Sequence, residues 1–526
     1  MKITIKFIII FAVSVTFLSC NDFLSKSPDN RTQMDNIEKI SQLLVSAYPS
    51  ANYSTLAELS SDNFVDNNSI LPVTLSSFEA MDDQIYAWQD ATKSTDEDSP
   101  SDVWVKCYAA IAAANHALAA IDELQVANAN INFDAQKGEA LVCRAYSHFI
   151  LVNVFSQAYK DDAASSLDVG IPYATTPETV VQGTYNRETV TSVYQKIQTD
   201  LETGLDLISD DSYKVPNYHF NQKAAHAFAA RFFLYKRDYQ KVLTHANRVL
   251  NSDPTNQMRN WTKYYGSTTE IGYDYIDANL PCNLLIMPTT STFNRIFGTR
   301  YGHNGDAMYG STYGSGPTWS GSLPCFAGKL YVSVQQDYGV FFPKCNEMFE
   351  YTDKVAGIGY THVTRAEFTI DETLLCRAEA LVYLNRIPEA VGDLQIWNKS
   401  HLAPNDLTQD LIKSFYVSGN TLFVKKLNAG KMSTSFTVSA TQLPFVNCIL
   451  HFRRIETIFD GYRWFDLKRY GIEITHGIGR TQVETLTYND TRRAIQLPQE
   501  VISAGIVPNP RTISAASKNA TFLFQK

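Results

Sequence analysis

A pair of amphipathic helices joined by a tight turn constrains the fold of this chain more than any other feature. In residues 221–254 apolar side chains recur at spacings of three and four, the period of an α-helix, first from Ala224 to Tyr235 and then from Tyr239 to Leu250. Lys236-Arg237-Asp238 forms the turn, and Pro254 is a helix stop. This arrangement is typical of a tetratricopeptide hairpin, which cannot bury its apolar side alone. We therefore expect further hairpins to pack against it.

Other segments carry the same pattern. Residues 371–401 predict a second hairpin with its turn at Arg386-Ile387-Pro388, and residues 104–124, 134–155 and 187–208 predict single helices. The units do not recur at a fixed period, which distinguishes the chain from a tandem solenoid. The sequence therefore predicts a mainly α fold of non-tandem tetratricopeptide-like hairpins, with long irregular loop insertions and little β structure.

The amino terminus has the pattern of an export signal. Lys2 and Lys6 precede an apolar run over residues 7–18, which is too short to span a bilayer, and Leu18-Ser19 stands directly before Cys20. A cysteine at this place indicates lipoprotein processing, so residues 1–19 are predicted to be a signal peptide and Cys20 the lipidated residue. An ordinary signal peptide followed by a chance cysteine is the alternative.

Composition and motifs exclude several function classes. The net charge of −9 argues against nucleic acid, and no later apolar stretch predicts a membrane span. Metalloprotease, nucleophile-elbow and P-loop motifs are missing, and the histidines show no spacing typical of metal ligands. Asp96 and Asp98 are interpreted as part of a solvated acidic loop. We therefore expect no catalysis, no metal and no cofactor.

The remaining seven cysteines include no C-x-x-C pair, so neither a zinc ribbon nor a thioredoxin-type motif is present. Cys107, Cys143 and Cys376 lie in helical patterns, where a free thiol acts as a small buried hydrophobe. A bridge between Cys325 and Cys345 stays open at this point, with no pattern that supports it.

Several specific motifs follow one another along the chain. The most specific stretch is residues 453–469, from Arg453-Arg454-Ile455-Glu456 to Leu467-Lys468-Arg469. The others are the start at Cys20-Asn21-Asp22-Phe23-Leu24, the helix with Arg144-Ala145-Tyr146 and the closing Leu497-Pro498-Gln499-Glu500. In this order and spacing they resemble the SusD/RagB family of outer-membrane nutrient-binding lipoproteins of Bacteroidetes. Phe452 and Thr457 depart from the family pattern. The resemblance implies a single SusD-like domain over residues 20–526, with an N-terminal part over about 20–255, a C-terminal part over about 256–526 and an aromatic insertion at 261–349.

The resemblance also implies a function. Family members capture a nutrient, in most cases a glycan and in some a peptide, at the exterior face of the outer membrane, and cover a SusC-like TonB-dependent transporter. A peptide- or protein-capturing lipoprotein is therefore the nearest alternative. The third possibility is a surface scaffold of tetratricopeptide type that binds no small ligand.

The long loops at 48–100 and 261–349 are the expected ligand-binding segments, because 17 of the 89 residues in the second are aromatic (19%, against 12% overall). Aromatic rings cover the apolar faces of sugars, and amide or carboxylate groups bind their hydroxyls. The expected ligand contacts are Trp319, Trp261, Tyr313, Tyr309, Tyr265, Trp88, Asn63 and Asp66, with Tyr264, Tyr273, Tyr275, Asn67 and Asn304 as further candidates. Arg463-Trp464-Phe465-Asp466 and the charges around it are instead expected to fix a C-terminal helix against the hairpins.

Overall fold

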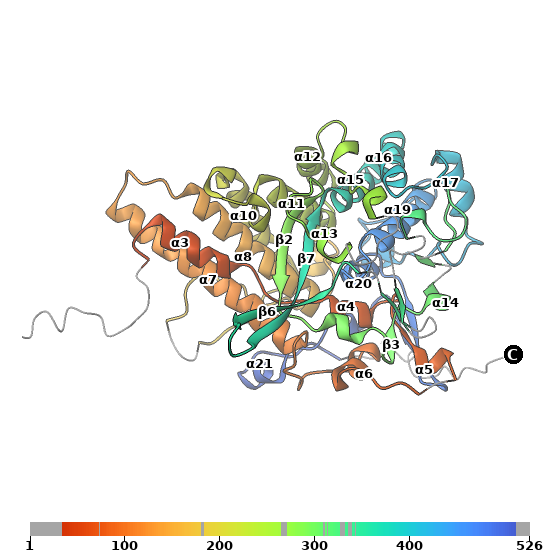
Figure 1. Cartoon of the computed structure of the whole chain (residues 1–526), viewed down its shortest axis with the longest axis horizontal. Coiled ribbons are helices and arrows are strands. Elements are labelled where there is room, and N and C mark those ends of the chain that lie inside the picture. Colours follow the sequence, from red (N-terminus) through yellow and green to blue (C-terminus); the bar gives the residue numbers. More distant parts are fainter. Residues whose placement is uncertain are drawn as a thin grey trace, which may run out of the picture.

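The structure is a computed structural model that describes residues 34–72, 74–179, 183–264, 271–308, 311–312, 314–326, 332–334, 339–341 and 343–511. Helices dominate it and strands are few, which confirms the predicted fold class (Figure 1). No helix in these ranges is long and apolar enough to cross a membrane. The helices of the hairpin region are α3 (Ile37–Leu44), α7 (Pro100–Ala127), α8 (Asp134–Phe155), α10 (Val190–Leu207), α11 (Gln222–Lys236), α12 (Tyr239–Leu250), α15 (Ile370–Tyr383) and α16 (Ile387–Ser400).

Both predicted hairpins are confirmed, α11 with α12 and α15 with α16. Each helix of the series α7, α8, α10, α11, α12, α15 and α16 packs against the next one. The stack therefore continues from α12 to α15 although the aromatic insertion separates them in sequence. Figure 1 shows this stack running along the back and top of the molecule, with α7 and α8 at the left and α16 at the upper right.

The turn between α11 and α12 follows from local chemistry. Arg237 adopts a left-handed conformation with φ of 67°, which ends α11, and the Asp238 side chain accepts a hydrogen bond from the Lys241 backbone N–H to cap α12. α11 is buried on nearly every side from Ala224 to Tyr235, not on one face as its pattern suggested, because it lies in the middle of the stack.

The largest sheet has three antiparallel strands in the order β2–β7–β6, from β2 (Asn283–Thr289), β7 (Ile358–Thr369) and β6 (Glu347–Asp353). β7 leads directly into α15, where the Thr369 side chain accepts from the Glu372 backbone N–H and caps the helix. β6 is an edge strand. The other strands form two-stranded pairs, β1 (Val65–Asp66) with β3 (Tyr301–Gly302), β4 (Val332–Val334) with β5 (Gly339–Phe341), and β8 (Ile474–Ile478) with β9 (Gln482–Leu486).

The C-terminal part contributes α17 (Gln409–Phe415), α18 (Ala429–Met432), α19 (Leu443–Glu456), α20 (Tyr462–Tyr470) and α21 (Gln499–Ser503). The first long loop forms α4 (Ser54–Ser60), α5 (Asn67–Ile70) and α6 (Ala80–Tyr86), and α9 (Asp162–Ser165), α13 (Ile271–Asp274) and α14 (Gly305–Met308) are single turns. Side chains from both predicted parts of the mature chain join one buried apolar core.

A chain of alternating buried charges ties α19 and α20 to the hairpins. Its members run from β7 through α11, α15 and α19 to α20, in the order Arg365, Glu367, Arg231, Glu372, Arg453, Asp466, Arg469, Glu379. Successive ion pairs measure 2.6–3.3 Å, and every side chain is at most 5% exposed. The predicted structural role of this charged block is confirmed.

Charge pairing decides the ionisation of Asp466. Burial alone would raise the pKa of this carboxyl, but the Arg453 and Arg469 guanidiniums outweigh burial and hold its pKa below the ordinary value.

The seven cysteines in the described ranges are buried free thiols, so Cys325 and Cys345 form no bridge.

Candidate functional site

The tryptophans predicted to contact ligand are all covered by the protein. Trp88, Trp261 and Trp319 are 5%, 3% and 4% exposed. Tyr265, Tyr309 and Tyr313 lie outside the described residues, as does Cys20. Of the further tyrosine candidates, Tyr264 and Tyr275 are buried and Tyr273 is exposed. Sugar stacking on the three tryptophans would require the covering segments to move, so their role in binding stays a prediction.

Each buried tryptophan has structural contacts of its own. Trp88 donates its indole N–H to the Ser60 carbonyl at 3.0 Å and stacks on His476 with ring centroids 4.1 Å apart. Trp319 donates to the Gly314 carbonyl at 2.9 Å. A Cβ on Gly316 would meet the Trp319 ring at 2.1 Å, so only glycine fits beside it.

Asn63 and Asp66 are also buried, and both serve the fold. The Asn63 amide donates to Glu58, and its oxygen accepts from Arg454 Nε at 2.8 Å. The Asp66 carboxylate pairs with Arg300 at 2.7 Å and caps α5 by accepting from the Asn68 backbone N–H. The Asp66–Arg300 pair and the pairing of β1 with β3 join the two long loops. The two side chains themselves face inward.

The acidic loop is only partly solvated. Asp96 is exposed, but Asp98 is buried and accepts hydrogen bonds from the Ser291 hydroxyl at 2.9 Å and the Thr292 N–H at 3.1 Å. The interpretation as a solvated loop is therefore wrong for Asp98, because β2 and the residues after it pack onto the loop. Burial raises the pKa of Asp98 to about 7, and the Asp102 carboxylate adds to this effect.

Asp98→Asn should change the pH dependence of stability. A carboxyl whose pKa is raised by folding contributes stability below its unfolded pKa of about 4, and this contribution is lost as pH rises through about 7. The stability of Asp98→Asn relative to the wild type should therefore be greater at pH 8 than at pH 5, with the difference between their free energies of unfolding on the order of 2 kcal/mol more positive at pH 8. Urea denaturation at both pH values measures this. The control is Asp96→Asn, a change at an exposed neighbour. If Asp98→Asn differed from the wild type in stability by the same amount at both pH values, the raised pKa of Asp98 would be contradicted.

A surface pocket of about 440 Å³ lies over α7 and was not expected from the sequence. α7 supplies its floor with Trp104, Tyr108, Ile111 and Asn115. The segment from Pro172 to Glu178 forms one wall, and Tyr185 and Ile506 complete the lining. We call this the α7 pocket. Its volume and its mixture of aromatic, aliphatic and polar lining residues are typical of a small-ligand site.

Hydrogen bonds hold the wall of the α7 pocket in place. The Asn115 amide donates to the Ala174 and Thr176 carbonyls at 3.3 Å, and Tyr108 donates to the Pro172 carbonyl at 2.7 Å. Arg144 donates to the Thr175 carbonyl at 3.2 Å and is itself fixed by Asp200 at 2.7 Å. The pocket is therefore preformed, which lowers the entropy cost of binding.

The mouth of the α7 pocket combines an exposed ring with polar groups. Tyr185 is 42% exposed, and a hydrogen bond to Glu178 raises the pKa of its hydroxyl. Thr175, Thr176 and Glu178 are also exposed. The sequence analysis did not single out this segment. Its only signal was a loop rich in proline, glycine and threonine between the second and third helices of the stack.

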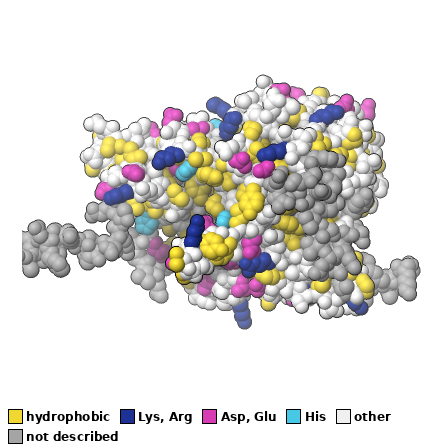
Figure 2. All heavy atoms as spheres, viewed as in Figure 1, with side chains coloured by type: hydrophobic (Ala, Val, Ile, Leu, Met, Phe, Trp, Pro, Cys, Tyr) yellow, Lys and Arg dark blue, Asp and Glu magenta, His cyan; other side chains and the backbone are white. Residues whose placement is uncertain are grey.

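A second exposed feature is the β6–β7 hairpin. Phe349 and Tyr351 on β6 and Tyr360 on β7 are 47%, 52% and 41% exposed, and the first two rings lie 4.8 Å apart in a T-shaped arrangement. Figure 2 shows apolar side chains gathered around this hairpin in the middle of the front face. Because β6 is the outer strand of its sheet, one row of its backbone groups is not paired within the sheet.

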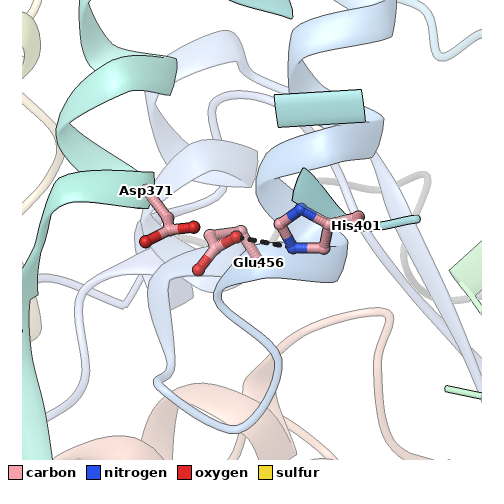
Figure 3. Close-up of side chains that lie close together, drawn as sticks. All are labelled: Asp371, His401 and Glu456. Atoms are coloured by element: carbon pink, nitrogen blue, oxygen red, sulfur yellow. Dashed lines mark ion pairs between the residues drawn. The ribbon is translucent and has the colours of Figure 1, made fainter. Parts of the chain in front are cut away.

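Three groups capable of binding metal meet in the interior, although they lie far apart in the sequence. Asp371 is at the start of α15, His401 follows α16, and Glu456 ends α19 (Figure 3). His401 Nε2 lies 3.1 Å from Glu456 Oε2. Burial raises the pKa of Asp371 to about 7, and the neighbouring Glu456 carboxylate adds to this effect. The scattered spacing of the histidines gave no indication of this cluster.

Comparisons with known proteins agree with the fold. A family model described as starch-binding and associating with the outer membrane matches residues 22–234, and a model described as the SusD family matches residues 324–504. SusD-like protein P2 of Formosa agariphila is 23% identical over 448 residues, covering 80% of this chain and 81% of that protein. A SusD superfamily protein from Bacteroides thetaiotaomicron superposes with a TM-score of 0.58 at 18% identity, covering 91% of this chain and 100% of the other. A SusD-like carbohydrate-binding protein from Bacteroides vulgatus gives a TM-score of 0.57 at 15% identity, with coverages of 89% and 96%.

Proposed function

Because the chain belongs to the SusD/RagB family, we propose that it is a lipid-anchored protein of the outer membrane that captures a glycan at the cell exterior and delivers it to a SusC-like TonB-dependent transporter. The description of the first matching family model, starch-binding and associating with the outer membrane, supports the ligand class and the location. The structural observation that supports the proposal is the α7 pocket, which is the proposed glycan-binding site.

The chemistry of the α7 pocket suits a sugar. Its aromatic floor can cover the apolar C–H face of a ring, and Glu178, Thr175 and Thr176 at the mouth can bind hydroxyl groups. A glycan too long for the pocket's volume of about 440 Å³ would continue across the exposed Tyr185. The chain's net charge of −9 also favours a neutral ligand over an anionic one.

Tyr185→Ala should weaken glycan binding about thirtyfold, because truncating an aromatic contact at a binding hot spot costs about 2 kcal/mol. Calorimetric titration of the mature protein against a panel of neutral oligosaccharides measures the change. The recovered oligosaccharide should keep its length, since the proposed function includes no catalysis.

Tyr218→Ala is the matched control, because Tyr218 is also an exposed tyrosine, at 52%, and lies outside the pocket lining. It should leave affinity unchanged. If Tyr185→Ala kept its glycan affinity while Tyr273→Ala or Trp319→Ala lost it, the glycan site would lie in the aromatic insertion instead.

A specific observation favours peptide capture as a second candidate function. The open edge of β6 can accept an extended peptide as an added strand, and the exposed Phe349 and Tyr351 side chains can contact its side chains. Tyr351→Ala should then weaken binding of a tryptic peptide mixture and leave oligosaccharide binding unchanged. If Tyr351→Ala weakened oligosaccharide binding and left peptide binding unchanged, the hairpin would be favoured as a glycan-binding surface.

Cys20→Ala should abolish incorporation of labelled palmitate and move the protein from the membrane fraction to the soluble fraction. The physical reason is that acyl chains buried in lipid provide the only proposed attachment. Cell fractionation with palmitate labelling measures this, and protease added to intact cells tests the outward orientation. Labelling that persists in the variant would contradict lipidation at Cys20.

A further inference from the structure

The interior cluster of Asp371, His401 and Glu456 has the composition of a metal site. One imidazole nitrogen and two carboxylate groups offer ligand atoms that all lie within 4.8 Å of one another (Figure 3). The three residues are 0%, 1% and 7% exposed. Imidazole and carboxylate together are ligands that Zn²⁺ accepts in proteins.

The orientation of His401 is that of a metal ligand. Its Nδ1 lies 2.9 Å from the Trp397 carbonyl, which can only accept, and 3.0 Å from the Ser400 hydroxyl. Nε2, on the other side of the ring, faces the Glu456 and Asp371 carboxylates. Nε2 is buried, and within the described residues it approaches Glu456 Oε2 at 3.1 Å. Histidines that bind metal commonly donate their other ring N–H to a backbone carbonyl in this way.

The carboxylates are also fixed by hydrogen bonds. Trp397 Nε1 donates to Glu456 Oε2 at 2.8 Å, and the Arg259 backbone N–H donates to the Asp371 oxygens at 3.2 and 3.3 Å. The Trp397 ring also stacks on His401 with centroids 3.8 Å apart. These contacts hold the three side chains close together in the interior.

The neighbouring cations are engaged elsewhere. The Arg259 guanidinium donates to the Tyr275 carbonyl and to Asn283 Oδ1, and Lys344 Nζ donates to Asp460 and to the Glu456 backbone carbonyl. In these contacts neither the Arg259 guanidinium nor Lys344 binds the two carboxylate groups directly, and burying carboxylate charge without a partner is costly.

We propose that Asp371, His401 and Glu456 bind a divalent transition-metal ion of the Zn²⁺ class, which ties the ends of α15, α16 and α19 together. Zn²⁺ ligand atoms at about 2.0–2.2 Å from the metal are separated by about 3.3 Å in a tetrahedral site. The His401–Glu456 separation of 3.1 Å already fits, and Asp371, whose ligand atom lies within 4.8 Å of the other two, needs to move inward by at most about 1.5 Å. Because the site is buried, the ion would enter as the chain folds.

The full mature chain is produced with added Zn²⁺ and in metal-depleted medium, then dialysed and assayed for bound metal by mass spectrometry. We expect stoichiometric Zn²⁺ in the first preparation and a melting temperature higher by on the order of 5 °C than in the second. His401→Gln and Asp371→Asn should each lose both the bound ion and the temperature difference. Asp371→Asn preserves side-chain volume, so it tests the site even if His401→Gln does not fold.

Two histidine variants serve as controls. His226 and His245 have Nδ1 atoms 3.0 Å apart between α11 and α12, so this pair could itself bind added Zn²⁺. His245→Ala should keep the ion, as should His451→Gln, which replaces another buried histidine. Absence of bound Zn²⁺ from the wild type, or Zn²⁺ that persists in folded Asp371→Asn, would overturn the proposal.

Discussion

Asp466→Ala should lower the free energy of unfolding by about 3–5 kcal/mol, because it leaves two buried guanidiniums without a shared counter-charge. Asp466 lies between Arg453 at 3.0 Å and Arg469 at 2.6 Å, and its side chain is 2% exposed. Removing one partner of a buried ion pair costs more than the pair contributes in net stability, since the remaining charge keeps its desolvation penalty. Urea denaturation followed by circular dichroism measures the change.

Glu389→Ala is a matched control for this prediction. Glu389 pairs with Arg386 at the same three-residue spacing as Asp466 and Arg469, but both side chains are about half exposed, at 45% for Arg386 and 54% for Glu389. An exposed pair in water contributes little to stability, because solvent and salt screen its attraction, so the control should change stability little. Similar losses in the two variants would show that the buried chain of charges does not determine stability.

Trp464→Ala should lower the free energy of unfolding by about 3–5 kcal/mol and leave the affinity for glycan unchanged. The side chain is 1% exposed and lies on α20 in the core, so truncation leaves a cavity that the surrounding helices fill only in part. Thermal unfolding and calorimetric titration of the same preparation separate the two effects.

Other aromatic variants place this result in context. Trp261→Ala and Trp319→Ala should also destabilise the protein, because both rings are almost fully buried. Tyr273→Ala should change stability by no more than about 0.5 kcal/mol, since Tyr273 is 68% exposed. A selective loss of glycan affinity in folded Trp464→Ala would place the ligand on α20, against our assignment.

Local chemistry explains which features the sequence determined. The hairpins of α11–α12 and α15–α16 were predictable because the helix period, the caps and the turn residues act within a few positions of each other. The structural role of residues 453–469 was also predictable, because charges of both signs at near-helical spacing in an apolar segment need partners. The sequence did not identify those partners, such as Glu372 and Glu379 on α15.

The candidate site depended on the tertiary structure. From the sequence, Trp88, Trp261 and Trp319 were predicted to contact ligand, but all three rings are buried. Exposure depends on which segments pack over a residue. Trp88, for example, is covered by His476, which lies almost 400 positions later in the chain. The α7 pocket and the Asp371–His401–Glu456 cluster each combine elements distant in sequence. Residue type and periodicity determined the helices of this protein. Contacts between distant segments, which no local pattern records, decided which side chains meet ligand, solvent or one another.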